Sequence, residues 1–271
     1  VITGGEDSYL SSTIDSIGGK FENNSANLDG GDIYNSGKIG TIGGTYTNNT
    51  AQNGKGGAIY NTNSGGDGYT PPEGDEEGLK FGEIDTITGT YTGNSAAEGG
   101  GAVYNNGNIE NINAAFNNNG KYSNDDKTVN TKIGGAIMND GNINNLYDST
   151  FKGDSSTEKG GAIYNEGSVS LGGDPASGGG AGKQNTVTFT GNSAADGGAI
   201  YNSGNLDVKQ SIFNGNTATN SGGAVYNNNT ATFTNTSFSG NKSSNGNGGA
   251  IYNGTNGVIE TLTATFQNNS A

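Results

Sequence analysis

The stretch that decides the fold runs from Gly197 to Asn216, GGAIYNSGNLDVKQSIFNGN, and it contains two phrases that recur along the whole chain. The first phrase is GGAIYN, and the second is an aromatic residue followed three positions later by Asn. Variants of GGAIYN occur eight times, ending at Asn35, Asn61, Asn105, Asn139, Asn165, Asn202, Asn227 and Asn253. A phrase that recurs in this way indicates one structural unit stacked on itself, as in a solenoid.

The second phrase sets the period of the repeat. It begins at Phe21, Tyr46, Tyr91, Phe116, Phe151, Phe189, Phe213, Phe238 and Phe266. It ends at Asn24, Asn49, Asn94, Asn119, Asp154, Asn192, Asn216, Asn241 and Asn269, so that Asp replaces Asn in one copy. Most intervals are 24 to 28 residues, and intervals of 45, 35 and 38 carry insertions. Runs rich in Gly, Pro or polar residues place these insertions at 64–80, 120–132 and 171–184, as loops that leave the stack.

The sequence contains one signal for helices. Several apolar triplets, such as Ile84, Ile87 and Tyr91, are spaced three and four apart, which suits one face of a helix. The composition argues against this interpretation, because 52 of the 271 residues are Gly and each Gly inside a helix costs about 1 kcal/mol against Ala. We therefore expect three short strands in each period, separated by turns at Gly and Asn.

Three strands in about 25 residues form the coil of a parallel β-helix, and strands of successive coils lie about 4.8 Å apart. One coil cannot bury its own apolar side chains, so stacking supplies the core. The Gly pair before each AIY piece is expected to form a corner with positive φ. Asn residues are expected at turns, in the left-handed region that Asn tolerates. Identical Asn side chains one coil apart can form hydrogen-bonded ladders, so we predict one ladder from the ends of each phrase.

Composition limits the functional classes. The chain has no Cys and no His, and its formal net charge is −14. The absence of Cys excludes disulfides and thiolate chemistry. A nucleic-acid partner needs a basic footprint, and an anionic membrane surface also attracts basic segments. No apolar run is long enough to cross a bilayer as a helix, so we expect neither nucleic-acid binding nor membrane insertion by this segment.

The two phrases in fixed order resemble the repeats of chlamydial polymorphic outer-membrane proteins and of similar bacterial autotransporter or adhesin-like proteins. The resemblance covers nearly the whole chain outside the insertions, and the motif residues that carry it are structural. It implies a right-handed β-helical passenger displayed outside the bacterial cell, with adhesion as the usual role. Host receptors, matrix proteins or glycans are the partners that it implies.

Other β-helices are polysaccharide enzymes, which leaves a second hypothesis open. One acid per coil beside the middle strand is expected to face outward: Asp15, Asp85, Glu110, Asp207 and Glu260. Glycosidase chemistry needs two carboxylates that flank the scissile bond, and the sequence shows a row with no sign of a cleft. We predict a solvated face and no catalytic residue or cofactor.

An acidic run in the first insertion offers oxygen ligands for Ca²⁺. Its candidates are Asp67, Asp75, Glu76 and Glu77, but they lack the spacing of a dedicated calcium loop. Hydroxyl-bearing pairs flank the aromatic residue in several coils, for example Thr45 with Thr47 and Thr90 with Thr92. Such rows on a flat solenoid suggest ice binding as a third hypothesis, and ordinary strand propensity also explains them.

These observations predict an all-β chain: a right-handed parallel β-helix of about nine coils of about 25 residues, forming a single domain over 1–271. Because the chain ends where the next GGAIYN is due, we expect a segment of a longer array. The expected function is a rigid, non-catalytic rod outside a bacterial cell, with recognition on the insertions or flat faces. Unpaired strand edges at its ends favour self-association end to end.

Overall fold

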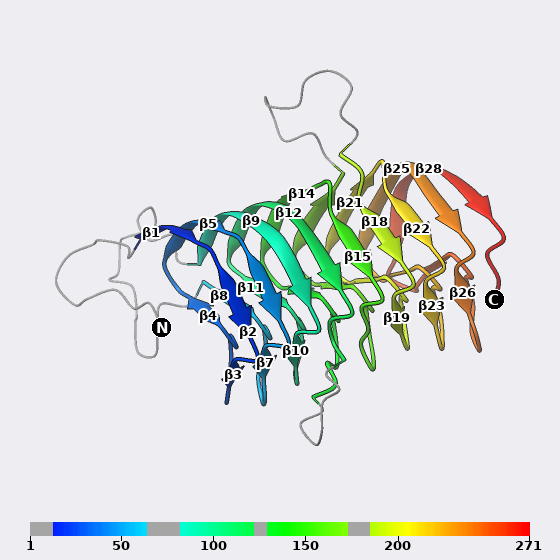
Figure 1. Ribbon diagram of the computed structural model, residues 1–271. Coiled ribbons are helices and arrows are strands. Elements are labelled where there is room, and N and C mark those ends of the chain that lie inside the picture. Colours follow the sequence, from blue (N-terminus) through cyan, green and yellow to red (C-terminus); the bar gives the residue numbers. More distant parts are fainter. Residues whose placement is uncertain (1–12, 64–81, 122–128, 173–184) are drawn as a thin grey trace.

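The chain forms a parallel β-helix in the computed structural model, which describes residues 13–63, 82–121, 129–172 and 185–271 (Figure 1). The coils follow one another along one axis, from β1 near the N-terminus to β28 near the C-terminus. Strands pair in parallel with their counterparts in the neighbouring coils, and the described residues contain no helix. The predicted all-β solenoid is therefore confirmed, whereas its right-handed winding and its count of nine coils stay predictions.

One sheet is built from the GGAIYN phrases, and we call it the tyrosine sheet. Within the described residues it has eight strands: β4 (Ile33–Asn35), β8 (Ile59–Thr62), β11 (Val103–Asn106), β13 (Ile137–Asn139), β16 (Ile163–Asn165), β20 (Ile200–Asn202), β24 (Val225–Asn227) and β27 (Ile251–Asn253). Ile pairs with Ile or Val, and Asn pairs with Asn, from coil to coil. Each coil therefore lies in register with the next.

The second sheet of the described residues has 14 strands and two strips. Its middle strip contains β1 (Thr13–Ile17), β5 (Lys38–Ile42), β14 (Asn142–Leu146), β17 (Ser168–Leu171) and β21 (Asn205–Lys209). Its aromatic strip contains β2 (Lys20–Glu22), β6 (Thr45–Thr47), β15 (Thr150–Lys152), β18 (Thr188–Thr190) and β22 (Ile212–Asn214). Four long strands run through both strips: β9 (Glu83–Thr92), β12 (Asn108–Asn117), β25 (Thr230–Ser239) and β28 (Val258–Gln267).

The remaining strands are two residues long and follow the second Asn phrase. They form two separate sheets within the described residues, one of β3 (Ser25–Ala26), β7 (Thr50–Ala51) and β10 (Ser95–Ala96), and one of β19 (Ser193–Ala194), β23 (Thr217–Ala218) and β26 (Lys242–Ser243). Between them lie the coils of Phe116 and Phe151, and an isolated bridge from Ser155 to Ser193 joins the second of these to the next coil.

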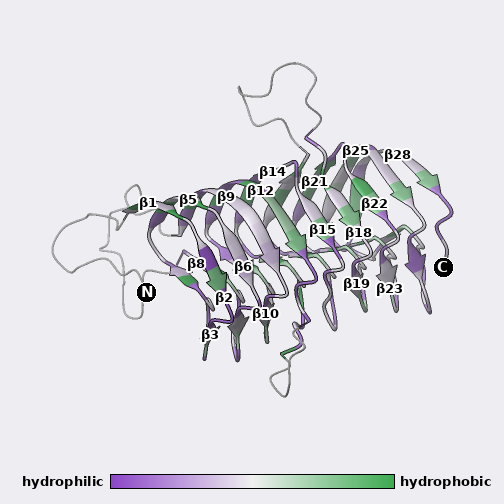
Figure 2. Ribbon diagram, in the orientation of Figure 1, coloured by the Kyte–Doolittle hydropathy of each residue, from purple (hydrophilic) through white to green (hydrophobic). Residues whose placement is uncertain are grey.

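A narrow core runs along the axis, and the hydropathy colours show the apolar residues on the strands that enclose it (Figure 2). The nine aromatic residues of the second phrase stack ring on ring with centroids 4.6 to 5.1 Å apart. Ile residues of the other strands surround this column. Like residues of successive coils thus lie one above the other, as the period of the sequence predicts.

The helix-like spacing has a different cause. Ile84, Ile87 and Tyr91 all lie in strand β9 and all are fully buried. Side chains of a regular strand alternate between its two sides, so a spacing of three on one side requires the strand to bend. Gly89, with φ of 96°, supplies a further bend between Ile87 and Tyr91. The strand follows the corner of the coil, and the helical period results from that path.

The two Gly residues of each GGAIYN phrase have different roles. The first one has positive φ, for example 64° at Gly160, as we expected for a corner. The second one packs against the next coil, because a Cβ added at Gly161 would lie 2.1 Å from the backbone oxygen of Gly198. The corner conformation requires the first Gly, and the spacing between coils requires the second.

The turn of the second phrase differs in one detail from our expectation. Positive φ falls on the residue just before the ladder Asn and not on that Asn. This preceding residue is itself Asn or Gly in each coil: Asn23, Asn48, Gly93, Asn118, Gly153, Gly191, Gly215, Gly240 and Asn268. The ladder Asn is free to point inward because its neighbour makes the turn.

Two predicted insertions have described ends that belong to the coils. Gly120 and Thr131 are buried, and Thr131 donates its backbone N–H to the oxygen of Gly120. Leu171 is the last residue of β17 and is fully buried, because it fills an inward position of the strand. The coil therefore includes these ends of 120–132 and 171–184, while all of 64–80 lies outside the described residues.

Replacement of the second Gly of a pair should destabilise the stack. Gly161→Ala places a methyl group against the backbone of Gly198 and Ser193, and such overpacking costs about 1–3 kcal/mol of unfolding free energy. Urea unfolding measures the loss. The control is Gly18→Ala, where an added Cβ meets nothing within 4 Å, and it should change stability by less than about 0.5 kcal/mol. Equal effects of the two variants would contradict the close-packing explanation.

Candidate functional site: the asparagine ladders and the outer faces

The first asparagine ladder runs along the inside of the tyrosine sheet. In each step, Nδ2 of one Asn donates to Oδ1 of the next at 2.8 to 2.9 Å, from Asn35 through Asn61, Asn105, Asn139, Asn165, Asn202 and Asn227 to Asn253. The members from Asn35 to Asn227 are fully buried. In several coils Nδ2 also donates to the carbonyl two residues on, as from Asn202 to Gly204 at 3.0 Å, which closes the turn.

The second asparagine ladder follows the aromatic column. Asn216 shows the pattern: its backbone N–H and its Nδ2 both donate to Oδ1 of Asn241, at 3.0 and 2.9 Å. Its Nδ2 also donates to the carbonyl of Phe189, the aromatic residue of the preceding coil, at 3.1 Å. At least one such bond joins each consecutive pair along Asn24, Asn49, Asn94, Asn119, Asp154, Asn192, Asn216, Asn241 and Asn269.

Asp154 is the one carboxyl group in these ladders. Its Oδ1 accepts two hydrogen bonds from Asn119, at 2.8 Å from the backbone N–H and 2.9 Å from Nδ2. Its own backbone N–H donates to Oδ1 of Asn192 at 2.9 Å. Its Oδ2 is buried without a hydrogen-bond partner. Burial raises the pKa of Asp154 to about 7.

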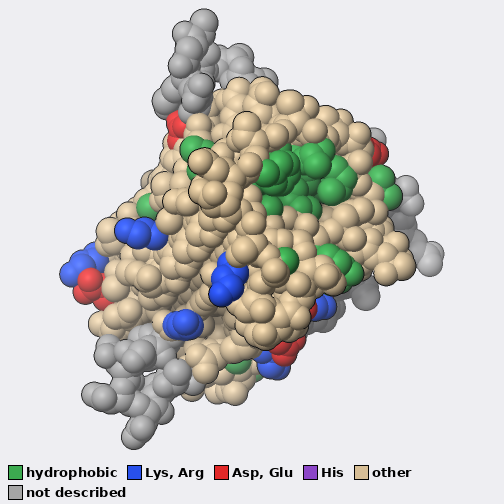
Figure 3. Space-filling model, turned by 90° about the vertical axis from the view of Figure 1, so that its right-hand side faces the viewer, with side chains coloured by type: hydrophobic (Ala, Val, Ile, Leu, Met, Phe, Trp, Pro, Cys, Tyr) green, Lys and Arg blue, Asp and Glu red, His purple; other side chains and the backbone are tan. Residues whose placement is uncertain are grey.

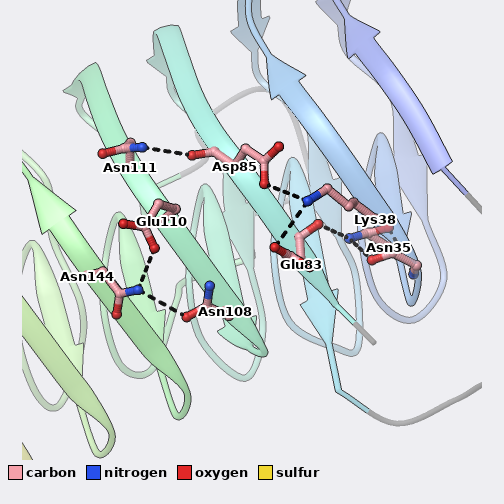
Figure 4. Close-up of polar contacts among 9 residues, drawn as sticks. Asn35, Lys38, Glu83, Asp85, Asn108, Glu110, Asn111 and Asn144 are labelled. Atoms are coloured by element: carbon pink, nitrogen blue, oxygen red, sulfur yellow. Dashed lines mark hydrogen bonds and ion pairs between the residues drawn. The ribbon is translucent and has the colours of Figure 1, made fainter. Parts of the chain in front are cut away.

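The outward acids form a row on the middle strip, and Figure 4 shows its first half. Lys38 contacts Glu83 at 3.2 Å and Asp85 at 3.1 Å. On the next strand Glu110 accepts hydrogen bonds from Nδ2 of Asn144 at 2.6 Å and of Asn145 at 3.2 Å. These partners lie on strands β5, β9, β12 and β14, side by side across one sheet.

This row suits a solvated surface. Its ion pairs are partly exposed, and surface pairs contribute about 0–1 kcal/mol each. Asp207 and Glu260 continue the row on β21 and β28. An irregular pairing of β14 with β17 separates both from the first half, and Glu260 itself lies in a second irregularity between β25 and β28. Asp85 and Glu110 lie side by side on neighbouring strands. Lys38 forms an ion pair with Asp85, and the side-chain amides of Asn144 and Asn145 donate to Glu110. The arrangement can bind polar groups along a flat face.

The outer side of the tyrosine sheet carries a second aromatic column. Its rings are Tyr34, Tyr60, Tyr104, Tyr164, Tyr201, Tyr226 and Tyr252, with Met138 in the place of one ring. Lys55 lies 4.3 Å from the ring centre of Tyr104, and Lys159 lies 4.7 Å from that of Tyr201. Because neighbouring rings cover one another's faces, the column offers edges and hydroxyl groups to a ligand.

Carboxylates accompany these phenols. The hydroxyl of Tyr104 donates to Asp140 at 2.9 Å, and that of Tyr164 donates to Glu166. Burial, followed by the neighbouring Asp140, raises the pKa of Tyr104 above its ordinary value. Both phenols therefore remain neutral hydrogen-bond donors at physiological pH.

The calcium candidates Asp67, Asp75, Glu76 and Glu77 lie outside the described residues. In the part of the chain that the structure describes, no group of three or more acids is placed to hold a metal ion. The hydroxyl rows beside the aromatic strip are interrupted by Ala115 and Ile212 in one row and by Asn117, Lys152, Asn214 and Gln267 in the other. An unbroken threonine array is therefore not present on this strip.

Comparison with known proteins finds a family model that matches three repeats in the C-terminal part of the chain. Residues 186–203, 210–228 and 235–254 match the model of the Chlamydia polymorphic membrane protein repeat. No curated protein and no solved structure matches the chain significantly. The chain carries repeats of this polymorphic membrane protein type, as the two phrases suggested, and this indicates a protein of the bacterial surface or outer membrane. The described residues include no helix suited to crossing a bilayer.

Sequence reasoning named the residues of both ladders but did not identify the outer tyrosine column as a packed cluster. The signal was present, because Tyr precedes the Asn in seven of the eight GGAIYN variants. In a strand, neighbours in sequence point to opposite sides, so an inward Asn requires an outward Tyr. Rings 4.7 to 5.5 Å apart then bury one another.

The hydrogen bonds of the buried first ladder should contribute strongly to the free energy of unfolding. Asn202→Ala removes the acceptor of Asn165 and the donor to Asn227. Each buried group left without a partner costs about 1–3 kcal/mol, so we expect a loss of about 2 kcal/mol or more in urea unfolding. The matched control is the exposed Asn245→Ala, which should change stability by less than about 0.5 kcal/mol. A small loss at Asn202 would show that the ladder is not a stabilising element.

Proposed function

We propose that this chain is the non-catalytic, adhesive rod of a bacterial surface protein. The observation that carries the proposal is the continuity of its interior: two amide ladders and one aromatic column join every coil to the next. Repeats that contact only their neighbours form an extended body with long surfaces for partners. Such a rod suits the presentation of a binding site away from a cell.

The outer faces support binding more than chemistry. The acids of the middle strip are engaged by Lys38 and by Asn side chains and face solvent along one sheet. General acid–base catalysis requires a group within hydrogen-bond reach of the proton that it moves, in a defined substrate pose. Host receptors, matrix proteins or glycans are the partners that we propose for the insertions and flat faces.

Recognition by the insertions can be separated from recognition by the faces. One variant replaces 64–81, 122–128 and 173–184 with short Gly-Ser links, and a second carries Asp85→Asn, Glu110→Gln and Asp207→Asn. Binding to host cells and to immobilised matrix proteins is measured for both. We expect loss of the insertions to lower binding at least about tenfold, a change of about 1.4 kcal/mol.

The control for the second variant is Glu158→Gln, an exposed acid away from the row. Circular dichroism verifies that each variant keeps its β structure. Unchanged binding in both variants would contradict the adhesive role of these surfaces. Incubation with neutral and acidic glycans, with and without Ca²⁺, should yield no cleavage product, and a product abolished by the second variant would establish a polysaccharide enzyme instead.

The face presented by the last described coil favours a second proposal, association with a second copy of this chain. Val258, Leu262 and Phe266 are 53%, 49% and 50% exposed there. Figure 3 shows an apolar patch on the surface that faces the viewer, and Leu262 and Phe266 line a hollow of about 540 Å³. An apolar patch of this kind on a soluble body marks an interaction surface.

The first described coil is the occupant that we propose for this face. Ile14, Ile17 and Phe21 repeat the spacing of Ile259, Leu262 and Phe266, and they are only partly buried. A heterologous contact of this kind adds copies in one direction. It would also bring Asp15 beside Glu260 in the acid row, so association should strengthen with salt.

Sedimentation at rising protein concentration tests this contact. The chain should form larger species, and Leu262→Lys with Phe266→Ser should keep it monomeric because a buried charge without a partner is costly. The matched control is Ile212→Lys, which changes an apolar residue that is 41% exposed on the side of the rod. A chain that stays monomeric at all concentrations, or an equal effect of the control, would refute the proposal.

A further inference from the structure

One position of the second asparagine ladder breaks its chemical pattern. Its other members carry an amide, whereas Asp154 carries a carboxyl group that is fully buried. Oδ1 of Asp154 takes the place of an amide oxygen, since it accepts both N–H groups of Asn119. Oδ2 therefore takes the place of an amide nitrogen, and it has no hydrogen-bond partner.

The other ladder residues indicate which groups face Oδ2 of Asp154. In the other coils the amide nitrogen donates to Oδ1 of the next ladder residue and to the carbonyl of the preceding aromatic residue, as in Asn216 with Asn241 and Phe189. The equivalent groups for Asp154 are Oδ1 of Asn192 and the carbonyl of Phe116. Both are acceptors, so an ionised carboxylate leaves three oxygens facing one another. A protonated carboxyl group has an O–H that can donate to one of them.

We propose that protonation of Asp154 stabilises the closed form of the coil that contains Phe151. With a proton on Oδ2, the carboxyl group donates across the ladder as an amide would, and the coil is closed. When the coil opens and the side chain reaches water, the carboxyl group releases this proton to solvent. Closing takes one proton back from solvent, so each opening event is coupled to one proton.

The surroundings of Asp154 favour the neutral form. Burial raises the pKa of Asp154 to about 7, against the opposing effect of hydrogen bonds from Asn119 and from the backbone of Lys152. The amides of Asn119 and Asn192 and the main-chain carbonyl of Phe116 are uncharged. The nearest charges along the chain, Lys152 and Glu158, are exposed. No adjacent cation is therefore shown that would stabilise the ionised carboxylate inside the stack.

Regular strand pairing is also interrupted at this coil, between the two sheets of two-residue strands. Neither sheet includes a strand from the coil, and one isolated bridge, from Ser155 to Ser193, joins it to the coil of Phe189. A hollow of about 180 Å³ lined by Gly120, Ser155 and Ser193 lies at the same place. Water can approach the coil there when it opens, which gives the proton a route to solvent.

The sign of the pH effect follows from linkage. The folded chain holds the proton of Asp154 up to a pKa of about 7, whereas the unfolded chain loses it near the ordinary carboxyl pKa of 3.8. Between these two values the folded state binds more protons, so this group's contribution to stability falls as pH rises. The contribution is fully present below pH 4 and is lost above about pH 7.

The experiment compares the chain with Asp154→Asn, which restores the amide pattern. Urea unfolding is measured from pH 4 to pH 8, with hydrogen exchange of the peptide that spans residues 150–156. Relative to Asp154→Asn, the unfolding equilibrium constant of the unmodified chain should rise up to about tenfold per pH unit between the two pKa values. After correction for the intrinsic acceleration of amide exchange with pH, the protection of this peptide should fall over the same range, and Asp154→Asn should abolish that fall.

Two controls separate the effect of Asp154 protonation from general effects of charge. Asn216→Asp places the same carboxyl group in another coil and should acquire the same pH dependence. Glu158→Gln removes an exposed charge nearby and should leave the pH dependence of the unmodified chain unchanged. The proposal is wrong if Asp154→Asn and the unmodified chain show the same pH dependence, or if Glu158→Gln removes it.

Discussion

The fold depends on the register of one coil upon the next, and buried amides enforce that register. A buried amide without partners is costly, and each interior Asn here finds partners in the neighbouring coils. A shift of one residue would turn the apolar side chains of a strand outward, and it would also break the ladder bonds along that strand. The amides therefore add specificity to a core that apolar packing alone would leave less strictly aligned.

Close approach of the backbones is the second half of this constraint. The second Gly of each pair sits where a Cβ would lie 2.0 to 2.4 Å from a backbone oxygen of the next coil. The short spacing that this permits brings the stacked rings to 4.6 to 5.1 Å, within the range of favourable aromatic contacts. Gly pairs, amide ladders and the aromatic column thus act together, which explains why the two phrases recur in a fixed order.

Much of this architecture could be predicted from the sequence because repetition makes the residue pairs explicit. Asn202 had to face Asn227 once the coils were aligned, and Phe213 had to stack on Phe238. Local backbone details were harder to predict, because the phrase does not show which residue turns the corner. Positive φ lies at Gly215, one residue before the ladder member Asn216. The merging of two strips into strands such as β12 also depends on corner geometry that repeat spacing does not encode.

Interior and exterior residues of the coils carry different information about function. Interior positions obey one rule per coil, so a departure such as Asp154 is visible against eight like copies and has a definite physical consequence. Exterior positions vary from coil to coil, as from Lys38 to Glu83 to Asn108 on the middle strip. This variation lets a common rod present different surfaces along its length. Under the proposed adhesive role, recognition can therefore change in such a protein without altering the ladders that hold it together.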